Sequence, residues 1–183
     1  GWLEKDIGQF NHPTKIFGIC GGAAIFRKSL FESIGLFDEK FFLLGEDLDI
    51  SFRAQLMGYQ CMYVPTAVVY HKVGATRGVK SKLSVYYSRR NLIFTFIKNF
   101  PTKLIKKYFF RIIIYHCISF IYNSFFGYGW LVVKAELYAI RNFKEMINKR
   151  IKIQKNQKVS VEYIDSILTT ESIYKKIHTV IKK

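Results

Sequence analysis

The stretch from Leu43 to Arg53, LLGEDLDISFR, constrains the chain most, because three carboxylates follow directly after a glycine that ends an apolar run. We expect the apolar run, Phe41 to Leu44, to be a strand and Gly45 to mark the start of a helix. The first turn of a helix has unpaired N–H groups and a partial positive charge, so it favours acidic side chains and holds them rigidly. A carboxylate held in this way can serve as a general base. An acidic cap on a surface helix is the alternative interpretation.

The spacing of charges within this helix predicts which carboxylate is paired. Arg53 follows Asp49 by four residues, which places both side chains on one face of the helix, where they can form an ion pair. Glu46 and Asp47 are then left to face elsewhere. These two residues are therefore the better candidates for contact with a substrate.

Length and charge bound the organisation of the chain. Its 183 residues, half of them apolar, are enough for one domain with a core, or for a domain with an appendage. The net charge is +16, and residues 98–183 carry most of it, with 17 Lys and Arg against 5 Asp and Glu. Such a basic tail suits the phosphates of nucleic acid or the anionic face of a membrane. We divide the chain into residues 1–100 and a basic amphipathic helical tail, residues 101–183.

The chain start and the cysteines suggest where the protein works. No secretion leader follows Gly1, and we expect the sequence to be a fragment of a longer protein. Cys20, Cys61 and Cys117 stand far apart in apolar surroundings, without the paired spacing of a zinc site or a disulfide framework. A reducing, cytoplasmic environment is the simplest one for such a chain.

Periodicity and turn residues predict the elements around the acidic helix. We expect strands over Ile16–Phe26, Gln60–Val64 and Ala67–Tyr70, and helices over Leu30–Ile34, Glu46–Met57, Ser84–Phe100 and Val161–Thr169. Glycines at positions 18, 21 and 22 interrupt the first strand and indicate that its backbone closely approaches a ligand or a neighbouring strand. The segment Lys72–Lys82 has two glycines, four basic residues and no acidic one, which suits a mobile loop able to close over phosphate. An exposed, solvated loop is the alternative.

The segment after Thr102 combines a polar stripe with a broad apolar surface. Polar residues recur there at three- and four-residue steps: Lys103, Lys106, Lys107, Arg111, Tyr115, Ser119, Tyr122 and Asn123. The 26 residues from Tyr108 to Val133 are long enough to span a bilayer, but the stripe and the break at Gly127–Gly129 favour a helix lying in the membrane interface. A buried helical hairpin and a true span are the alternatives. We expect a second amphipathic helix from about Trp130 to Lys155.

Several pieces of the first half, taken in order, resemble one family. They are Gly21-Gly22-Ala23 before a strand ending in Arg27, then residues 34–42 (IGLFDEKFF), residues 45–53 (GEDLDISFR), Gly58-Tyr59, residues 64–67 (VPTA), His71 and residues 86–91 (YYSRRN). Their order and spacing over roughly Ile16 to Asn91 resemble the second half of the family 2 inverting glycosyltransferases of GT-A fold. The remainder is similar to the tails of bacterial rhamnosyltransferase-like members.

This resemblance implies a fold and a chemistry. The fold would be α/β, the C-terminal half of a Rossmann-like GT-A domain followed by amphipathic membrane-associated helices. In the family pattern Asp47 would be the general base that takes the proton of the acceptor hydroxyl. His71 would be one ligand of a divalent metal, and oxygen and imidazole ligands suit Mg²⁺ or Mn²⁺. The substrate-binding candidates are Gly21, Gly22, Glu46, Asp49, Arg77, Arg90 and Asn91, the last two with helix packing as the alternative.

The sequence also departs from the family pattern. No Asp-x-Asp motif lies upstream of Gly21, and the nucleotide-binding half of the fold is missing from this stretch. We therefore expect the C-terminal portion of an enzyme, inactive alone.

The resulting hypothesis is a bacterial inverting glycosyltransferase, peripheral on the cytoplasmic face of the cell membrane. It would move a sugar, with rhamnose suggested by the tail, from a nucleotide-sugar donor to a growing cell-envelope polysaccharide or lipid-linked acceptor. Its expected partners are the donor, the acceptor and an anionic membrane surface, but no nucleic acid. The alternative is a non-catalytic membrane adaptor on a degenerate transferase scaffold. A basic nucleic-acid-binding protein fits the charge but leaves the ordered motifs unexplained.

Overall fold

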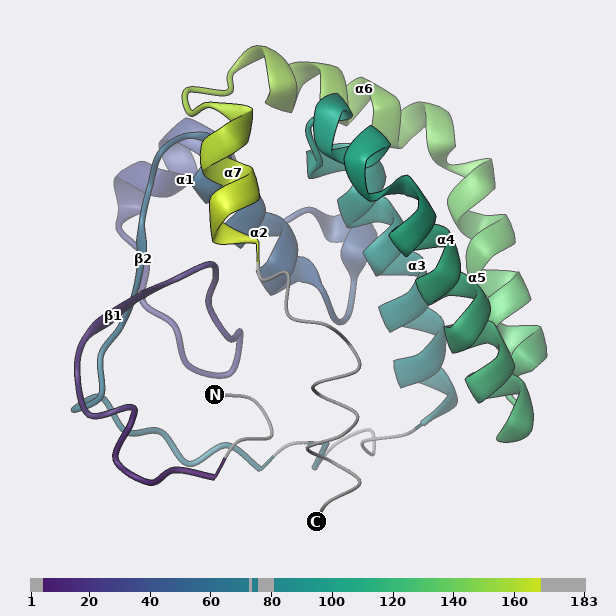
Figure 1. Ribbon diagram of the computed structural model, residues 1–183, viewed down its shortest axis with the longest axis horizontal. Coiled ribbons are helices and arrows are strands. Elements are labelled where there is room, and N and C mark those ends of the chain that lie inside the picture. Colours follow the sequence, from purple (N-terminus) through teal and green to yellow (C-terminus); the bar gives the residue numbers. More distant parts are fainter. Residues whose placement is uncertain (1–4, 73, 76–80, 169–183) are drawn as a thin grey trace.

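The computed structural model describes residues 5–72, 74–75 and 81–168. Within this part, a small two-stranded sheet lies at one side of the molecule and a group of helices at the other, with α2 (Glu46–Leu56) between them (Figure 1). The architecture is mixed but mainly helical, and it is compatible with the expected α/β class.

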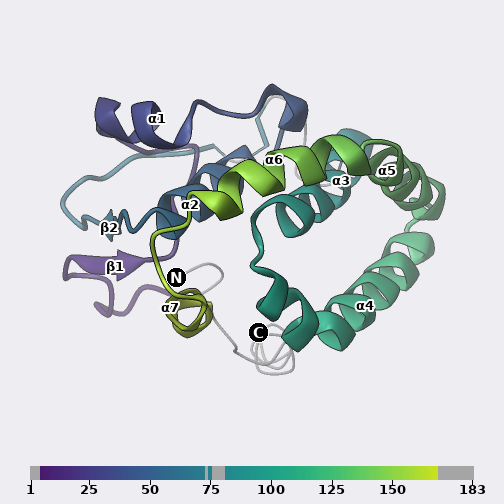
Figure 2. The same cartoon turned by 90° about the horizontal axis from the view of Figure 1, so that it is seen from above.

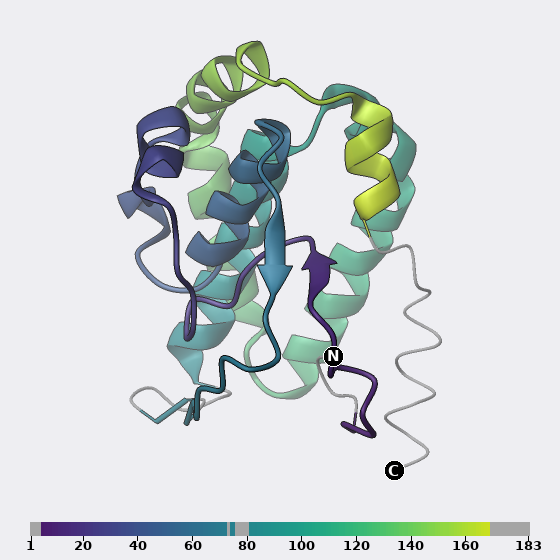
Figure 3. The same ribbon diagram turned by 90° about the vertical axis from the view of Figure 1, so that its left-hand side faces the viewer.

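The sheet consists of β1 (Thr14–Ile16) and β2 (Cys61–Tyr63), which pair antiparallel with Lys15 opposite Met62 (Figure 3). β1 shares only Ile16 with a predicted strand, and β2 is shorter than predicted. β2 lies within its predicted range of Gln60–Val64, whereas residues 67–70 are not a strand.

The strand predicted over Ile16–Phe26 is wrong. After Ile16 the chain leaves the sheet, and only an isolated bridge between Cys20 and Ala23 forms beyond it. The physical reason is that the glycines of this segment bring its backbone against α2 and not against a partner strand. An apolar, glycine-interrupted run therefore serves here as a loop.

The apolar run before α2 is not a strand either. The 3-10 helix η1 (Glu39–Phe41) is followed by a tight turn in which Phe42 and Leu44 have positive φ angles of 58° and 66°. Phe41 is buried and Phe42 exposed, an alternation that a strand would also produce. Periodicity alone does not distinguish the two conformations.

Four predicted helices are confirmed to within a few residues: α1 (Lys28–Ile34), α2, α3 (Lys82–Asn99) and α7 (Val161–Ile167). Local signals account for their ends. The side chains of Ser81 and Ser160 cap α3 and α7, each accepting a hydrogen bond from a backbone N–H three residues further on. Gly35 ends α1 with a φ of +79°.

The two long helices predicted for the tail are divided differently in the structure. The chain forms α4 (Thr102–Phe125), α5 (Gly129–Arg141) and α6 (Phe143–Lys155). A turn at Gly127, whose φ is +74°, separates α4 from α5, which confirms the break expected at Gly127–Gly129. A second break, at Asn142, interrupts the helix predicted from Trp130 to Lys155.

None of the helices in the described part of the chain combines the length and apolar character that crossing a lipid bilayer requires.

α3 is the central element of the helical side. It packs on α5 and α6, and α4 packs on α5 along the outer edge of the group (Figure 2). One core cluster joins η1, α3, α5 and α6 through Phe41, Phe94, Ala139 and Met146. A second joins α2, the α3–α4 junction and α7 through Phe52, Leu56, Phe100, Leu104 and Ile164. The second cluster fixes α2 against the helices, and the first fixes η1, which precedes α2.

Contacts also cross the expected boundary at residue 100. Arg150 of α6 donates hydrogen bonds to the carbonyls of Ile97 and Phe100, and Lys149 donates to Asp38 at 2.8 Å. The division into residues 1–100 and 101–183 stays a prediction, but α6 packs as part of the fold.

Candidate active site

The N-terminus of α2 carries the acidic cluster that the sequence singles out. Gly45 is its N-cap, with a left-handed φ of +82°, and Glu46, Asp47 and Asp49 lie in the first turn. A side chain on Gly45 would be strained there, and its Cβ would lie 3.3 Å from Cβ of Asn91. Glycine is thus the residue that allows the chain to turn sharply from η1 into α2.

Asp47 faces the loop that follows β1. Its Oδ2 accepts a 3.1 Å hydrogen bond from the backbone N–H of Gly21, and its Oδ1 accepts from the N–H of Leu48 at 2.8 Å. The two bonds orient a half-buried carboxylate at an open edge. Since each carboxylate oxygen can accept more than one hydrogen bond, Asp47 retains capacity for a substrate hydroxyl.

Ser51, one helical turn after Asp47, ties the same loop to α2. Its Oγ accepts from the backbone N–H of Ile19 at 3.1 Å and donates to the carbonyl of Asp47 at 2.6 Å. Gly18 permits this approach, because a Cβ at that position would lie 2.5 Å from Cβ of Ser51. The close approach that the glycines predict is therefore made to a helix.

His71 lies against the next glycine of the loop. An ideal Cβ on Gly22 would stand 2.4 Å from Nδ1 of His71, so only a residue without a side chain fits beside the ring. The predicted base, Asp47, and the predicted ligand, His71, thus border successive residues, Gly21 and Gly22. Both glycines and His71 are exposed, which leaves this edge accessible to solvent and substrate.

Asp49 points to the opposite side of α2, into the interior. Its Oδ2 accepts from Nε of Arg53 at 2.9 Å, which confirms the predicted pair. Its Oδ1 accepts from Asn99 and lies 2.8 Å from Nζ of Lys98. All these contacts lie within the fold, and the substrate-binding role of Asp49 stays a prediction.

Asp38 extends this network to the tail. Its carboxylate binds Lys98 at 2.7 Å and Lys149 at 2.8 Å. Burial alone would raise the pKa of Asp38, but hydrogen bonds from Lys149 and Lys98 outweigh it and lower the pKa to about 2. The network therefore holds α2, α3 and α6 together behind the acidic edge.

Arg90 and Asn91 face the turn that precedes α2. Arg90 Nη2 donates to the carbonyls of Lys40 and Phe41, each at 2.8 Å. Asn91 Nδ2 donates to the carbonyls of Phe41 and Leu43, each at 2.8 Å, and to a third in the same turn. Both side chains are buried. Their predicted contact with substrate stays a prediction, while the contacts seen here shape the turn.

Two further residues, Glu46 and Arg77, are predicted to contact the substrate, and the structure describes only the first. Oε2 of Glu46 is buried and has no hydrogen-bond partner among the described residues, so its capacity to accept a hydrogen bond is unused there. Arg77, with most of the predicted phosphate loop, lies outside the described residues.

The prediction missed Ser51, Lys98 and Asp38 as residues that position the site. Ser51 had a usable signal, because it lies four residues after Asp47 on the same helix face. Lys98 reaches Asp38 and Asp49 across long sequence separations, and no local pattern indicates such contacts.

A divalent metal fits this edge only in part. His71 offers one imidazole, but among the described residues no group of three His, Cys, Asp or Glu side chains could hold a metal ion. The donor set is therefore incomplete in this part of the chain, and no chemical step below is derived through a metal.

Comparisons with known proteins give a family and two curated relatives. Residues 1–138 match the family described as glycosyl transferase family group 2. Two curated relatives, from Mycobacterium tuberculosis strains CDC 1551 / Oshkosh and ATCC 25618 / H37Rv, are 35% identical to this chain over 71 residues. Both are named N-acetylglucosaminyl-diphospho-decaprenol L-rhamnosyltransferase. The matched segment covers 38% of this chain and 23% of each relative, so the chain spans only part of their length. No solved structure matches.

Proposed function

The chain belongs to glycosyl transferase family group 2, and from this premise we propose that it supplies the catalytic base and acceptor side of an inverting glycosyltransferase. The donor is a nucleotide-activated sugar. The observation that carries the proposal is the pairing of Asp47 with Gly21 and of His71 with Gly22, which gathers two distant segments on one loop.

In the proposed reaction Asp47 acts on the acceptor hydroxyl. The hydroxyl proton passes to a carboxylate oxygen of Asp47 while the acceptor oxygen forms a bond to the anomeric carbon of the donor. The bond from that carbon to the nucleoside diphosphate breaks on the opposite face, and its electron pair leaves with the diphosphate. Attack from the face opposite the leaving group inverts the configuration at the anomeric carbon. The Gly21 N–H bond holds the carboxylate in one orientation for this step.

The proposed substrates follow from the relatives. Because those proteins are named L-rhamnosyltransferases acting on N-acetylglucosaminyl-diphospho-decaprenol, we propose a nucleotide-activated rhamnose as donor and a lipid-linked N-acetylglucosaminyl diphosphate as acceptor. Members of the family commonly use a divalent metal, and His71 is the residue of this chain that would contribute a ligand.

A lipid-linked acceptor requires the protein to work at a membrane, and we propose that α4 rests on the cytoplasmic face. Its polar residues His116, Ser119 and Asn123 are partly covered by the fold, whereas apolar residues are exposed on its other sides. The exposed apolar set is Phe109, Phe110, Ile113, Ile114, Ile118, Phe120, Ile121 and Phe125. This set supports contact with acyl chains, and exposed lysines at the start of α4 support contact with anionic head groups.

Contacts on the inner side of α4 fix the orientation of this helix relative to α3 and α5. His116 Nδ1 lies 2.9 Å from Nη2 of Arg89 on α3 and 3.4 Å from Glu136 on α5. Burial and the nearby Arg89 lower the pKa of His116, although Glu136 opposes them, so the neutral ring is favoured at this position.

The test uses the full-length gene product with a panel of nucleotide sugars, including activated L-rhamnose, with and without Mg²⁺ or Mn²⁺. We expect Asp47→Asn to abolish transfer while the binding of the nucleotide sugar, measured by calorimetry, is retained. Asp6→Asn, at an exposed carboxylate before β1, is the matched control and should keep wild-type turnover. Unchanged turnover in Asp47→Asn would refute the base assignment. A folded protein without turnover on any donor would favour the membrane adaptor.

A further inference from the structure

The turn between η1 and α2 adopts a strained conformation at Phe42. Its φ and ψ are 58° and −53°, and the N–H of Leu43 donates a 2.6 Å hydrogen bond to the carbonyl of Phe41. These values describe a γ-turn with positive φ, a rare conformation that is costly for a residue with a side chain. Backbone strain of this kind persists only where the surroundings impose it, and it gathers at functional sites.

The surroundings do impose it, through two buried side chains of α3. Within the turn, the carbonyl of Phe41 accepts three hydrogen bonds, from Leu43 N–H, Arg90 and Asn91. Asn91 also donates to the carbonyl of Leu43, so the peptide group before Phe42 and the one after Leu43 are both fixed. The fold therefore holds this turn in place from a buried, hydrogen-bonded side.

The turn places an apolar ring in water. Phe42 is 78% exposed, whereas its neighbour Phe41 is fully buried in the core. The Phe42 ring rests beside Tyr87, with centroids 5.3 Å apart and planes tilted by 39°, and Tyr86 packs edge-on against Tyr87 at 5.2 Å. Arg90 lies under this group, 4.6 Å from the centroid of Tyr87. An exposed ring on a strained backbone adds nothing evident to the stability of the fold.

The position of the ring suggests its ligand. Phe42 precedes the Gly45-Glu46-Asp47 corner by only three residues, and the turn lies between α2 and α3 (Figure 1). One face of a pyranose ring consists of C–H groups and packs on aromatic faces, while its hydroxyls stay free to meet polar groups at the edge. Glu46, a half-buried carboxylate whose Oε2 has no hydrogen-bond partner among the described residues, is such a group.

We propose that Phe42, supported by Tyr87, is a stacking platform for the acceptor sugar whose hydroxyl is presented to Asp47. This inference rests on the proposed function and adds to it the surface that positions the acceptor. Arg90 and Asn91 are positioning residues in this scheme, since they act through the turn and not on the sugar.

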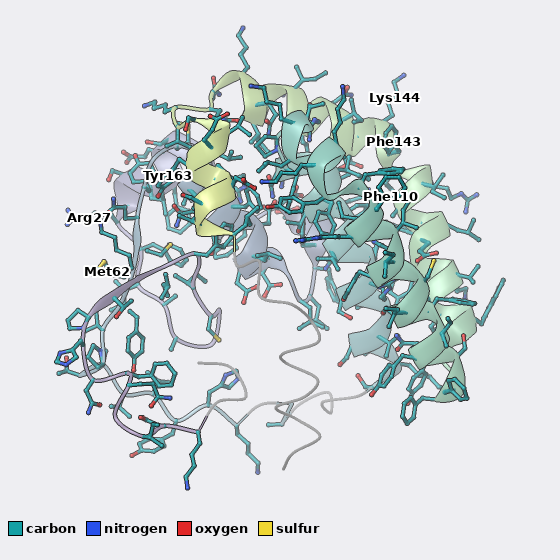
Figure 4. All side chains as sticks on the ribbon, in the orientation of Figure 1. Arg27, Met62, Phe110, Phe143, Lys144 and Tyr163 are labelled. Atoms are coloured by element: carbon teal, nitrogen blue, oxygen red, sulfur yellow. The ribbon has the colours of Figure 1, made fainter. Side chains whose placement is uncertain are left out.

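The first measurement is kinetic, on the full-length protein with activated L-rhamnose and a short-chain N-acetylglucosaminyl-diphospho-polyprenol. We expect Phe42→Ala to raise the KM for the acceptor roughly tenfold and to leave the KM for the donor unchanged. Phe42→Tyr should behave as wild type, because it keeps the ring. Phe143→Ala removes another exposed phenylalanine, on α6 at the far edge of the molecule (Figure 4), and should change neither constant. Equal rises in both KM values for Phe42→Ala would overturn the proposal.

A second variant separates the ring from the fold. Phe42→Gly removes the ring and also relieves the strain, because glycine adopts positive φ freely, so it should unfold at a higher temperature than Phe42→Ala. We expect both variants to share the same raised acceptor KM. An acceptor KM that follows thermal stability would show a structural role and overturn the proposal.

Two further readouts distinguish failure of this inference from failure of the proposed function. Calorimetric binding of a soluble N-acetylglucosaminyl diphosphate requires no turnover, and Phe42→Ala should weaken it roughly tenfold. Weakened binding in a protein that transfers no sugar would support the platform and refute the transferase. Binding equal to that of wild type would overturn the platform. Loss of binding to phosphatidylglycerol vesicles in Phe42→Ala would overturn it too, because the ring would then contact lipid.

Discussion

Lys98 of α3 places its ammonium group 2.8 Å from Oδ1 of Asp49 on α2, and the side chains of both residues are almost completely buried. Asp49 lies on the face of α2 opposite to Asp47. This contact therefore determines how Asp47 is turned toward the loop that carries Gly18, Gly21 and Gly22, the glycine loop. Arg53 strengthens the same side by donating to the carbonyls of Ile34, Gly35 and Leu36. The position of the candidate base thus depends on buried charges behind it.

Replacing Lys98 by methionine should therefore destabilise the protein strongly. Among the described residues, the change leaves Asp49 paired with Arg53 alone and Asp38 with Lys149 alone, and breaking a buried pair from one side costs about 3 kcal/mol or more. The matched control is Lys40→Met, which removes the more exposed ion pair with Glu145 and should cost below about 1 kcal/mol. Urea unfolding at neutral pH measures both. Similar losses in the two variants would contradict the central role of the buried network.

The stability of the protein should fall in acid through Asp38. Its pKa is lowered from 3.8 to about 2 in the folded state, so the ionised carboxylate is favoured by folding. This contribution, about 2 kcal/mol, is complete above about pH 4 and is lost as the pH falls toward about 2. Urea unfolding of wild type and Asp38→Asn across this range tests it. The difference in stability between the two should shrink as the pH falls, and a constant difference would contradict the prediction.

Substitutions in the glycine loop should separate the roles of its two glycines. Gly22→Ala forces a Cβ to within 2.4 Å of His71 unless the ring moves, whereas a Cβ on Gly21 meets Asp47 at an ordinary 3.6 Å. We expect Gly22→Ala to raise the concentration of Mg²⁺ or Mn²⁺ needed for half-maximal turnover roughly tenfold or more. Gly21→Ala should raise the same metal concentration about threefold at most. Turnover titrated with metal measures both, and equal rises would argue against a role for the position of His71.

Helices and the acidic corner could be predicted because their signals are local. Gly45, the carboxylates after it and the Asp49–Arg53 spacing lie within one stretch, and the structure keeps them together. The serine caps of α3 and α7 are equally local. The sequence alone therefore located α2 and the pair that turns Asp49 inward.

Strands and the details of the site depend on partners distant in sequence. The Phe41–Leu44 run alternates as a strand does, but Arg90 and Asn91, about fifty residues away, draw it into a γ-turn. The segment after Ile16 likewise packs on Ser51 and Asp47. Only the family resemblance connected His71 with Asp47, because no spacing rule links them. That Asp47 lies against Gly21 and His71 against the adjacent Gly22 becomes apparent only in the folded chain.

Binding to membranes should depend on both the exposed lysines and the exposed phenylalanines of α4. Lys103 and Lys106 are exposed near its start, and each lysine near an anionic surface contributes about 1 kcal/mol, so replacing either by glutamine should weaken binding about fivefold. Arg27→Gln removes an exposed charge near α1, on the opposite side of the molecule from Phe110 in Figure 4, and should have little effect. Phe110→Ala should weaken binding by a similar factor through lost apolar contact.

Flotation with phosphatidylglycerol-containing and neutral vesicles measures these effects. Because exposed charges are screened by salt, binding through the lysines should decline as the salt concentration rises and should require the anionic lipid. Equal flotation with both vesicle types at high salt would contradict a peripheral, charge-assisted contact. A loss that is larger for Arg27→Gln than for the α4 variants would place the membrane on the other face of the molecule.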